Sequence, residues 1–256
     1  MSWLRSALYQ PLFIAWTLLL AILYLPLLAG PPLGVQRAAR LWVRGAHFLQ
    51  RAVLGLGWEL RGREHLPRGA ALFAVKHQSA WETMVFHVLL DDPVFVLKKE
   101  LLGLPFIGWY LKASGQIAID RAAGIRALAA MAKAAGDALA QGRQVVVFPE
   151  GHRQPPGVAG TYLPGVAMLY GEAGAPTIPV ALNSGLFWGR NAFLRRPGRI
   201  VLEVLPPMPQ GLDRRAFLDE LRTRIEAATH RLEAEALARY PHLPRPGLAP
   251  PKLAEG

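Results

Sequence analysis

From Trp58 onward the chain alternates short apolar runs with longer amphipathic stretches, and this pattern limits the fold more than any other feature of the sequence. Such alternation is typical of an α/β domain, in which helices cover the faces of a central sheet. The predicted strands are Trp58–Arg61, Ala71–Val75, Val94–Leu97, Gln116–Ile119, Gln144–Phe148, Thr177–Leu182 and Ile200–Leu205. The predicted helices are Trp81–Leu90, Phe106–Ala113, Gly124–Ala140, Pro164–Glu172 and Asp213–Arg239.

The N-terminal segment has no charged side chain between Arg5 and Arg37. Within it, residues 12–28 are almost continuously apolar, and Pro11 and Pro26 bracket a stretch just short of the ~20 residues that cross a bilayer comfortably. A cleaved signal peptide fits less well, because its apolar region is usually only ~7–15 residues long. We therefore expect a membrane segment, and both spanning the bilayer and lying in one leaflet fit the sequence.

A second helical stretch, residues 35–56, combines an apolar face with a rim of arginines: Arg37, Arg40, Arg44 and Arg51. This pattern is typical of an interfacial helix, although an ordinary helix packed on the domain fits equally well. A helical hairpin inserted into one leaflet satisfies both N-terminal stretches. We divide the chain into N-terminal membrane-anchoring helices (1–56), an α/β domain (57–240) and a proline-rich C-terminal tail (241–256).

The composition narrows the class of partner. The formal net charge is +11, and 52% of the 256 residues are hydrophobic. A basic and apolar chain suits an anionic membrane surface or phosphorylated substrates. Nucleic acid is not expected as a partner, because no nucleic-acid-binding motif is present. The chain has no cysteine, which excludes disulfides and thiolate chemistry.

The segment from Val75 to Glu82 joins a predicted strand to a predicted helix. A spacing of five rotates side chains by roughly 140° on a helix, so His77 and Glu82 cannot share a helical face. His77 is therefore expected in the turn, where a carboxylate in the first helical turn would fix its tautomer and make it a general base for an alcohol. A structural alternative is a capping box in which Ser79 and Glu82 satisfy the helix N-terminus.

Further polar groups follow other predicted strands, where open α/β sheets place their sites. Lys98 could present an ammonium group to a phosphate, and Arg121 ends the strand at 116–119. After the strand at 144–148, we expect an exposed Glu150 and Arg153 around Gly151, where Arg153 could bind a phosphate through two hydrogen bonds. Each group also has an ordinary explanation. Lys98 could belong to a solvated charge cluster, Arg121 could form a surface salt bridge, and residues 149–151 could be a common turn.

Taken together and in this order, these motifs resemble the glycerolipid acyltransferases of the 1-acylglycerol-3-phosphate acyltransferase (lysophosphatidic acid acyltransferase) family. The family's His-x4-Asp motif appears as residues 77–82, and its Phe-Pro-Glu-Gly-Thr-Arg motif resembles residues 148–153. Its second and fourth motifs resemble residues 115–121 and 178–180. Glu82 replaces the usual aspartate and His152 the usual threonine, and both departures bear on substrate choice more than on reaction type.

The resemblance implies an α/β fold with a mixed central sheet flanked by helices, together with an N-terminal membrane-associated helical hairpin. It also implies acyl transfer from acyl-CoA or acyl carrier protein to the sn-2 hydroxyl of 1-acyl-glycerol-3-phosphate, giving phosphatidic acid at the cytoplasmic face of a bacterial inner membrane. His77 would be the general base and Glu82 its orienting group, with no metal or cofactor expected. The implied acceptor pocket consists of Lys98, Arg121, Glu150, Gly151 and Arg153.

Three alternatives stay open at this stage. The acceptor could be another lysolipid, such as a lyso-ornithine lipid. A membrane-bound metallohydrolase would use His77, Glu82, Glu150 and His152 as ligands, and a lipid-binding module would need no catalytic histidine. No linear motif reports the acyl-chain length, the donor or the oligomeric state.

A basic cluster near the C-terminal third has no acidic residue within it. We expect it to face anionic headgroups or an acidic carrier protein, and a solvated loop fits equally well. Its members are Arg190, Arg195, Arg196 and Arg199.

Overall fold

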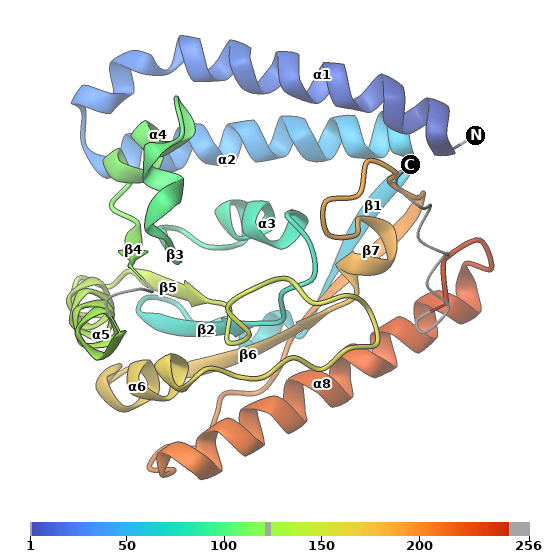
Figure 1. Cartoon of the computed structure of the whole chain (residues 1–256). Helices are drawn as coiled ribbons and strands as arrows, with labels where there is room; N and C mark the ends of the chain where they lie inside the picture. The colour runs from blue at the N-terminus through green and yellow to red at the C-terminus, as the bar shows by residue number, and fades with distance from the viewer. Residues whose placement is uncertain (1, 121–123, 246–256) are drawn as a thin grey trace, which may run out of the picture.

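A computed structural model describes residues 2–120 and 124–245. In this part of the chain one seven-stranded sheet has the order β1-β7-β6-β2-β5-β3-β4 (Figure 1). The strands are β1 (Leu56–Arg61), β2 (Ala71–Val75), β3 (Pro93–Lys98), β4 (Ile117–Ile119), β5 (Gln144–Val147), β6 (Thr177–Leu182) and β7 (Gly198–Val204). The strands from β6 to β4 run parallel, whereas β7 pairs antiparallel with β6. The sheet is therefore mixed, as the resemblance implied.

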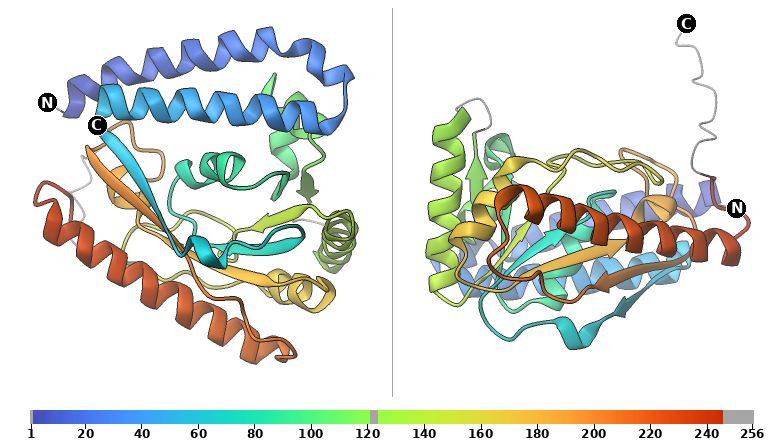
Figure 2. Two further views of the ribbon diagram at one scale, coloured as in Figure 1. Left: turned by 180° about the vertical axis from the view of Figure 1, so that it is seen from behind. Right: turned by 90° about the horizontal axis from the view of Figure 1, so that it is seen from below.

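Helices cover both faces of this sheet. They are α1 (Ser2–Leu23), α2 (Pro32–Leu49), α3 (Trp81–Leu89), α4 (Ile107–Ala113), α5 (Gly124–Ala140), α6 (Pro164–Glu172), α7 (Ser184–Phe187) and α8 (Arg214–Arg239). Figures 1 and 2 show α1, α2 and α3 on one side of the sheet and α6 and α8 on the other, with α5 beside β4. The fold class is α/β, as predicted.

The central strands are buried on both faces because helices cover both. In β2, Phe73 and Val75 belong to the hydrophobic core beneath α2 and α3, whereas Leu72 and Ala74 belong to the core beneath α5, α6 and α8. All five residues of β2 are buried. This explains why the strand is a continuous apolar run in the sequence rather than an alternating one.

The predicted strands and the helices after residue 80 are confirmed, with ends that differ by two residues or fewer. The N-terminal helix differs more, because α1 begins at Ser2 and contains Pro11 in its interior. Proline lacks the N–H needed for a helical hydrogen bond, so it was expected to limit the helix. Packing on both sides of Pro11 maintains the helix: Tyr9 is fully buried, and the rings of Tyr9 and Phe13 stack with centroids 5.5 Å apart.

The helical hairpin α1–α2 is held together by tryptophans. The Trp16 indole donates a hydrogen bond to the Trp42 carbonyl (2.9 Å), and the Trp42 indole donates one to Thr17 Oγ1 (3.0 Å). Gly45 leaves room for the Trp16 ring, which would clash with a Cβ at that position. Residues of both helices, including Tyr9 and Val43, share one core with the sheet. The division of the chain at residue 56 stays a prediction.

Most of α1 is nevertheless exposed. It is the one helix among the described residues that is long and apolar enough to cross a membrane, and only 17% of its most apolar window is buried. Its exposed large apolar side chains are Trp3, Leu4, Leu8, Leu12, Ile14, Leu18, Leu19, Ile22 and Leu23. This exposed face is consistent with the predicted membrane association.

The carboxyl ends of the parallel strands β6, β2, β5 and β3 lie next to one another at the same end of the sheet, here called the C-terminal edge. Because open α/β sheets bind ligands beyond the carboxyl ends of their strands, residues that are far apart in the chain meet at this edge. The segments that follow these strands begin at Lys76, Lys99, Phe148 and Asn183. This edge contains the candidate site.

Candidate active site

The predicted histidine–carboxylate pair is present in the turn between β2 and α3. His77 lies between the end of the strand at Val75 and the start of the helix at Trp81. Its Nδ1 is 2.9 Å from Glu82 Oε1. The imidazole is largely enclosed, with 12% of its side chain exposed, and it stacks on the Phe148 ring at a centroid distance of 4.0 Å.

Glu82 is fully buried and makes four hydrogen bonds. Its Oε1 accepts from the backbone N–H groups of Gln78 (2.6 Å) and Ser79 (2.5 Å) as well as from His77, and its Oε2 accepts from Ser184 Oγ (2.8 Å). The carboxylate therefore orients the histidine and satisfies the backbone at the helix start at the same time. Of the alternative capping box only one half forms, in which Glu82 accepts from the Ser79 N–H. The Ser79 hydroxyl instead accepts from the Trp81 N–H (3.1 Å), and the N-cap residue is Ala80, whose methyl side chain cannot cap the helix.

The orientation of His77 decides which nitrogen can act. A fully buried carboxylate at hydrogen-bond distance favours the tautomer in which Nδ1–H donates to Glu82. In that tautomer Nε2 has its lone pair free to accept a proton. The geometry is that of a general base with a fixed orienting group.

Glu150 differs from its prediction, because it is fully buried rather than exposed. Its Oε1 accepts a hydrogen bond from Lys76 Nζ (2.7 Å), and its Oε2 accepts one from the backbone N–H of His77 (3.0 Å). Strand β5 lies beside β2, which brings the segment after one strand against the segment after the other. Burial raises the pKa of Glu150, and the neighbouring ammonium group of Lys76 opposes that rise. Glu150 thus supports the backbone of the histidine turn.

The other predicted pocket residues lie along the same edge. Lys98 ends β3 and is exposed, and Arg153 is half-buried. Gly151 has φ +68°, a left-handed conformation that favours glycine. Strand spacing of about 4.8 Å puts the end of β3 about 10 Å across the sheet from the end of β2. Arg121 lies outside the described residues.

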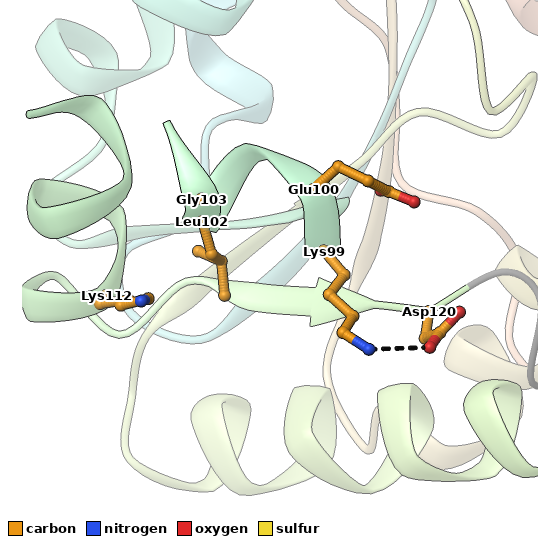
Figure 3. Close-up of a pocket in the computed structure, with 6 residues that line it drawn as sticks. All are labelled: Lys99, Glu100, Leu102, Gly103, Lys112 and Asp120. Carbon is orange, nitrogen blue, oxygen red and sulfur yellow. Dashed lines mark hydrogen bonds and ion pairs between the residues drawn. The ribbon is translucent and has the colours of Figure 1, made fainter. Parts of the chain in front are cut away.

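A shallow cavity of about 530 Å³ opens beside the end of β3 (Figure 3). Lys99 and Asp120 meet there in an exposed ion pair of 3.0 Å. The cavity is lined by Lys99, Glu100, Leu102, Gly103, Lys112 and Asp120. It is separate from His77 and Glu82.

The basic cluster is not a uniform exposed patch. Arg195 is buried, with its guanidinium 4.3 Å from the Trp188 ring and 4.9 Å from the Tyr9 ring. Its backbone N–H donates to Ser6 Oγ at 2.9 Å. Burial lowers the pKa of Arg195. The prediction that this residue faces headgroups is wrong, because the aromatic rings of α1 and of the segment after α7 enclose the arginine.

The four residues of the alternative metal site are not gathered around one point. Glu150 turns toward Lys76, and His152 Nε2 lies 3.0 Å from the amide nitrogen of Gln154. Across residues 2–120 and 124–245, no group of three or more His, Cys, Asp or Glu side chains is arranged to hold a metal ion.

Comparison with known proteins identifies the family. A family model described as Acyltransferase matches residues 57–183. The 1-acyl-sn-glycerol-3-phosphate acyltransferase of Pseudomonas aeruginosa is 38% identical over 194 residues, which cover 76% of each chain. This chain belongs to the 1-acyl-sn-glycerol-3-phosphate acyltransferase family. The alpha enzyme of that name from Mus musculus is 31% identical over 242 residues, covering 91% of this chain and 84% of the mouse protein.

A solved structure has the same fold as this family member. The crystal structure of the 1-acyl-sn-glycerophosphate (LPA) acyltransferase PlsC from Thermotoga maritima aligns with a TM-score of 0.73 and 19% sequence identity. The alignment covers 91% of this chain and 100% of the Thermotoga maritima chain. The mixed sheet and the N-terminal helices are therefore shared.

Sequence reasoning did not assign a role to three residues that contact or flank the candidate site residues. Ser184 holds Glu82 from the end of β6, one residue beyond the segment that the family model matches. Lys76 and Gln78 flank the histidine and turn into the protein, where both are buried. The only signal in the sequence was position: Ser184 is the second residue after a predicted strand, and the pairing of that strand with β2 brings it to Glu82.

Proposed function

We propose that this chain transfers a fatty acyl group from a thioester to the sn-2 hydroxyl of 1-acyl-glycerol-3-phosphate, forming phosphatidic acid for phospholipid synthesis. The observation that carries the proposal is the 2.9 Å contact between His77 Nδ1 and a fully buried Glu82 in the turn after β2. The family membership supports the same reaction. The donor is acyl-CoA or acyl carrier protein.

In the proposed reaction His77 Nε2 takes the proton of the acceptor hydroxyl as its oxygen attacks the thioester carbonyl carbon. Collapse of the tetrahedral intermediate breaks the carbon–sulfur bond, and the imidazolium returns the proton to the departing thiolate. Glu82 stabilises the imidazolium formed between these steps. General base catalysis of this kind is typically worth about 10²–10⁴-fold in rate.

We propose that the acceptor's phosphate binds across the strand ends beside His77. Lys98 and Arg153 supply positive charge, Arg121 is proposed to do so too, and Gly151 lets the backbone approach the ligand. Their contribution is positioning, because a hydroxyl held close to the base reacts faster than one in solution. Glu150 contributes indirectly, through Lys76 and the His77 backbone.

Membrane association brings the site to its lipid acceptor. We propose that α1 lies in one leaflet, at the cytoplasmic face of a bacterial inner membrane. Contacts near both of its ends hold it along the domain: Ser6 Oγ accepts from the Arg195 N–H, and the Ala21 carbonyl accepts from the Tyr110 hydroxyl at 2.7 Å. A helix fixed at both ends to the domain surface cannot extend away from it across the bilayer.

The test is acyl transfer to a panel of lysolipids, with His77→Ala and Glu82→Gln beside the unmodified protein. We expect phosphatidic acid from 1-acyl-glycerol-3-phosphate, at least about 10³-fold slower with His77→Ala and about 10²-fold slower with Glu82→Gln. Turnover with a lyso-ornithine lipid alone would keep the mechanism and change the acceptor. Unchanged activity in folded His77→Ala would overturn the proposed base.

A further inference from the structure

Helix α8 places two carboxylates inside the protein. Glu226 and Glu233 are only 8% and 4% exposed. They are seven positions apart, and seven residues turn an α-helix to within about 20° of the same direction, so both face the sheet. Both lie beyond residues 57–183, where the family model matches. Buried carboxylates are costly unless they are paired, so their partners indicate their role.

Glu226 binds the residue that precedes the catalytic histidine. The Lys76 ammonium lies 2.8 Å and 3.0 Å from the two carboxylate oxygens of Glu226. It also donates to Glu150 (2.7 Å) and to the Val158 carbonyl (3.0 Å). Lys76 is fully buried, so the ammonium is satisfied entirely by these protein groups. Glu226 also accepts from the Tyr162 hydroxyl at 3.0 Å.

Glu233 binds the residue that follows the histidine. Its Oε1 accepts from the side-chain amide of Gln78 at 2.7 Å, and its Oε2 accepts from the backbone N–H of Gly157 at 3.0 Å. The other end of the same amide, Gln78 Oε1, accepts from the Gly185 N–H at 3.0 Å. Burial raises the pKa of Glu233, and these hydrogen bonds oppose the rise.

We propose that Glu226 and Glu233 are positioning residues for His77. They hold its two chain neighbours from one rigid helix, and this fixes the backbone that aims the imidazole; the assignment rests on the proposed acyltransferase reaction. Apolar residues already anchor α8 to the sheet, with Phe217, Leu221, Ile225 and Leu232 fully buried. The two carboxylates are therefore not needed to anchor α8. They are needed to bind Lys76 and Gln78, the residues on either side of His77. Figure 1 shows α8 running beneath the strands from which the site projects.

The decisive experiment exchanges an amide and a carboxylate. Glu233→Gln alone leaves an amide N–H₂ group facing another donor, and Gln78→Glu alone sets two carboxylates against each other. The double variant Gln78→Glu/Glu233→Gln restores every bond: Glu at 78 accepts from Gly185 N–H and from the new amide, whose oxygen accepts from Gly157 N–H. The exchange keeps the composition and the net charge.

We expect each single variant to lower kcat by at least about tenfold with KM changed by less than about twofold, because a small misplacement of a catalytic group mainly slows the chemical step. The double variant should recover kcat to within about threefold of the unmodified protein. The effects of the two substitutions on kcat would then be strongly non-additive, as expected for two side chains in direct contact. Glu220→Gln is the matched control, because Glu220 lies on the same helix in a partly exposed pair with Arg224, away from Lys76 and Gln78. It should leave kcat and KM unchanged.

A second readout does not depend on turnover. Diethyl pyrocarbonate modification of His77 is followed by mass spectrometry relative to the exposed His242 of the same molecules. The single variants should raise this ratio by about threefold or more as the enclosed ring loosens, and the double variant should reverse the rise. If the modification ratio changed in the single variants but the unmodified protein showed no acyl transfer, the proposed reaction would be rejected and the positioning of His77 by these residues would be retained. Unchanged kcat and ratio in the single variants, or no recovery in the double variant, would overturn the positioning role.

Discussion

At the residue scale, the site depends on one glutamate that serves two purposes. The same Glu82 oxygen accepts from His77 and from two backbone N–H groups of the turn, while the other oxygen accepts from Ser184. Glutamate is longer than the aspartate usual in this family, and here its carboxylate reaches back from the first turn of α3 to the histidine. The group that lies against His77 and the group that satisfies the backbone of the turn are thus one residue, so a substitution at Glu82 affects both.

A different histidine, His87, predicts how stability depends on pH. Its Nδ1 is shielded without a partner among the described residues, and burial, aided by the Arg40 charge, lowers its pKa from 6.5 to about 4. The unfolded chain therefore binds a proton between pH 6.5 and pH 4 that the folded chain rejects, and stability falls as the pH falls through this window. Between pH 7.5 and pH 5 the loss from one such group is about 2 kcal/mol.

We expect His87→Leu to reduce the loss of unfolding free energy between pH 7.5 and pH 5 by about 2 kcal/mol. Denaturant unfolding in mild detergent at the two pH values measures this difference. Part of the pH dependence should stay, because burial also lowers the pKa of His47 to about 4. His230→Gln, at an exposed position, is the control. An equal loss in His87→Leu and in the unmodified protein would contradict the prediction.

At the element scale, Arg195 joins α1 to the domain. Its guanidinium packs against Tyr9 of α1 and Trp188, and its backbone binds Ser6. We expect Arg195→Glu to destabilise the protein by roughly 2–4 kcal/mol, because it would bury an unpaired carboxylate against two aromatic faces. Arg195→Met keeps most of the packing and should cost roughly 1 kcal/mol.

Thermal unfolding in detergent ranks these variants, and binding to anionic vesicles separates a packing role from headgroup contact. Arg195→Met should bind vesicles as the unmodified protein does, whereas Arg190→Met removes an exposed charge and serves as the comparison. If Arg195→Met weakened vesicle binding as much as Arg190→Met does while leaving stability unchanged, the headgroup role expected from the sequence would be restored.

At the scale of the whole molecule, the exposed apolar surface extends beyond α1. Helix α4 and the residues leading into it, the α4 segment (residues 99–113), add the exposed apolar side chains Leu101, Leu104, Ile107 and Trp109. The bond from the Tyr110 hydroxyl to the Ala21 carbonyl fixes α4 beside the end of α1, as Figure 1 shows. Helix α1 and the α4 segment therefore lie together as exposed apolar surface, consistent with the proposed membrane association.

This arrangement predicts which apolar residues contact lipid. We expect Ile107→Ser to weaken partitioning into vesicles by about five- to thirtyfold, since an inserted apolar side chain is worth roughly 1–2 kcal/mol. Ile125→Ser is the matched control, because Ile125 is 83% exposed but lies on α5. Vesicle co-sedimentation measures both. Equal weakening by the two substitutions would show that the α4 segment has no particular membrane role.

The sequence by itself determined most of the elements and the histidine–carboxylate pair of the proposed site. Burial on both faces makes the central strands apolar runs, and the five-residue spacing places His77 in the turn within reach of Glu82, so both can be recognised from local order. Only the tertiary structure decided which residues support that pair. Strand order places Ser184 beside β2, and α8 brings Glu226 and Glu233 to Lys76 and Gln78 across about 150 residues of chain. It also buried Glu150 and Arg195, which by charge alone belong at the surface, because a charged side chain stays buried once the fold supplies its partners.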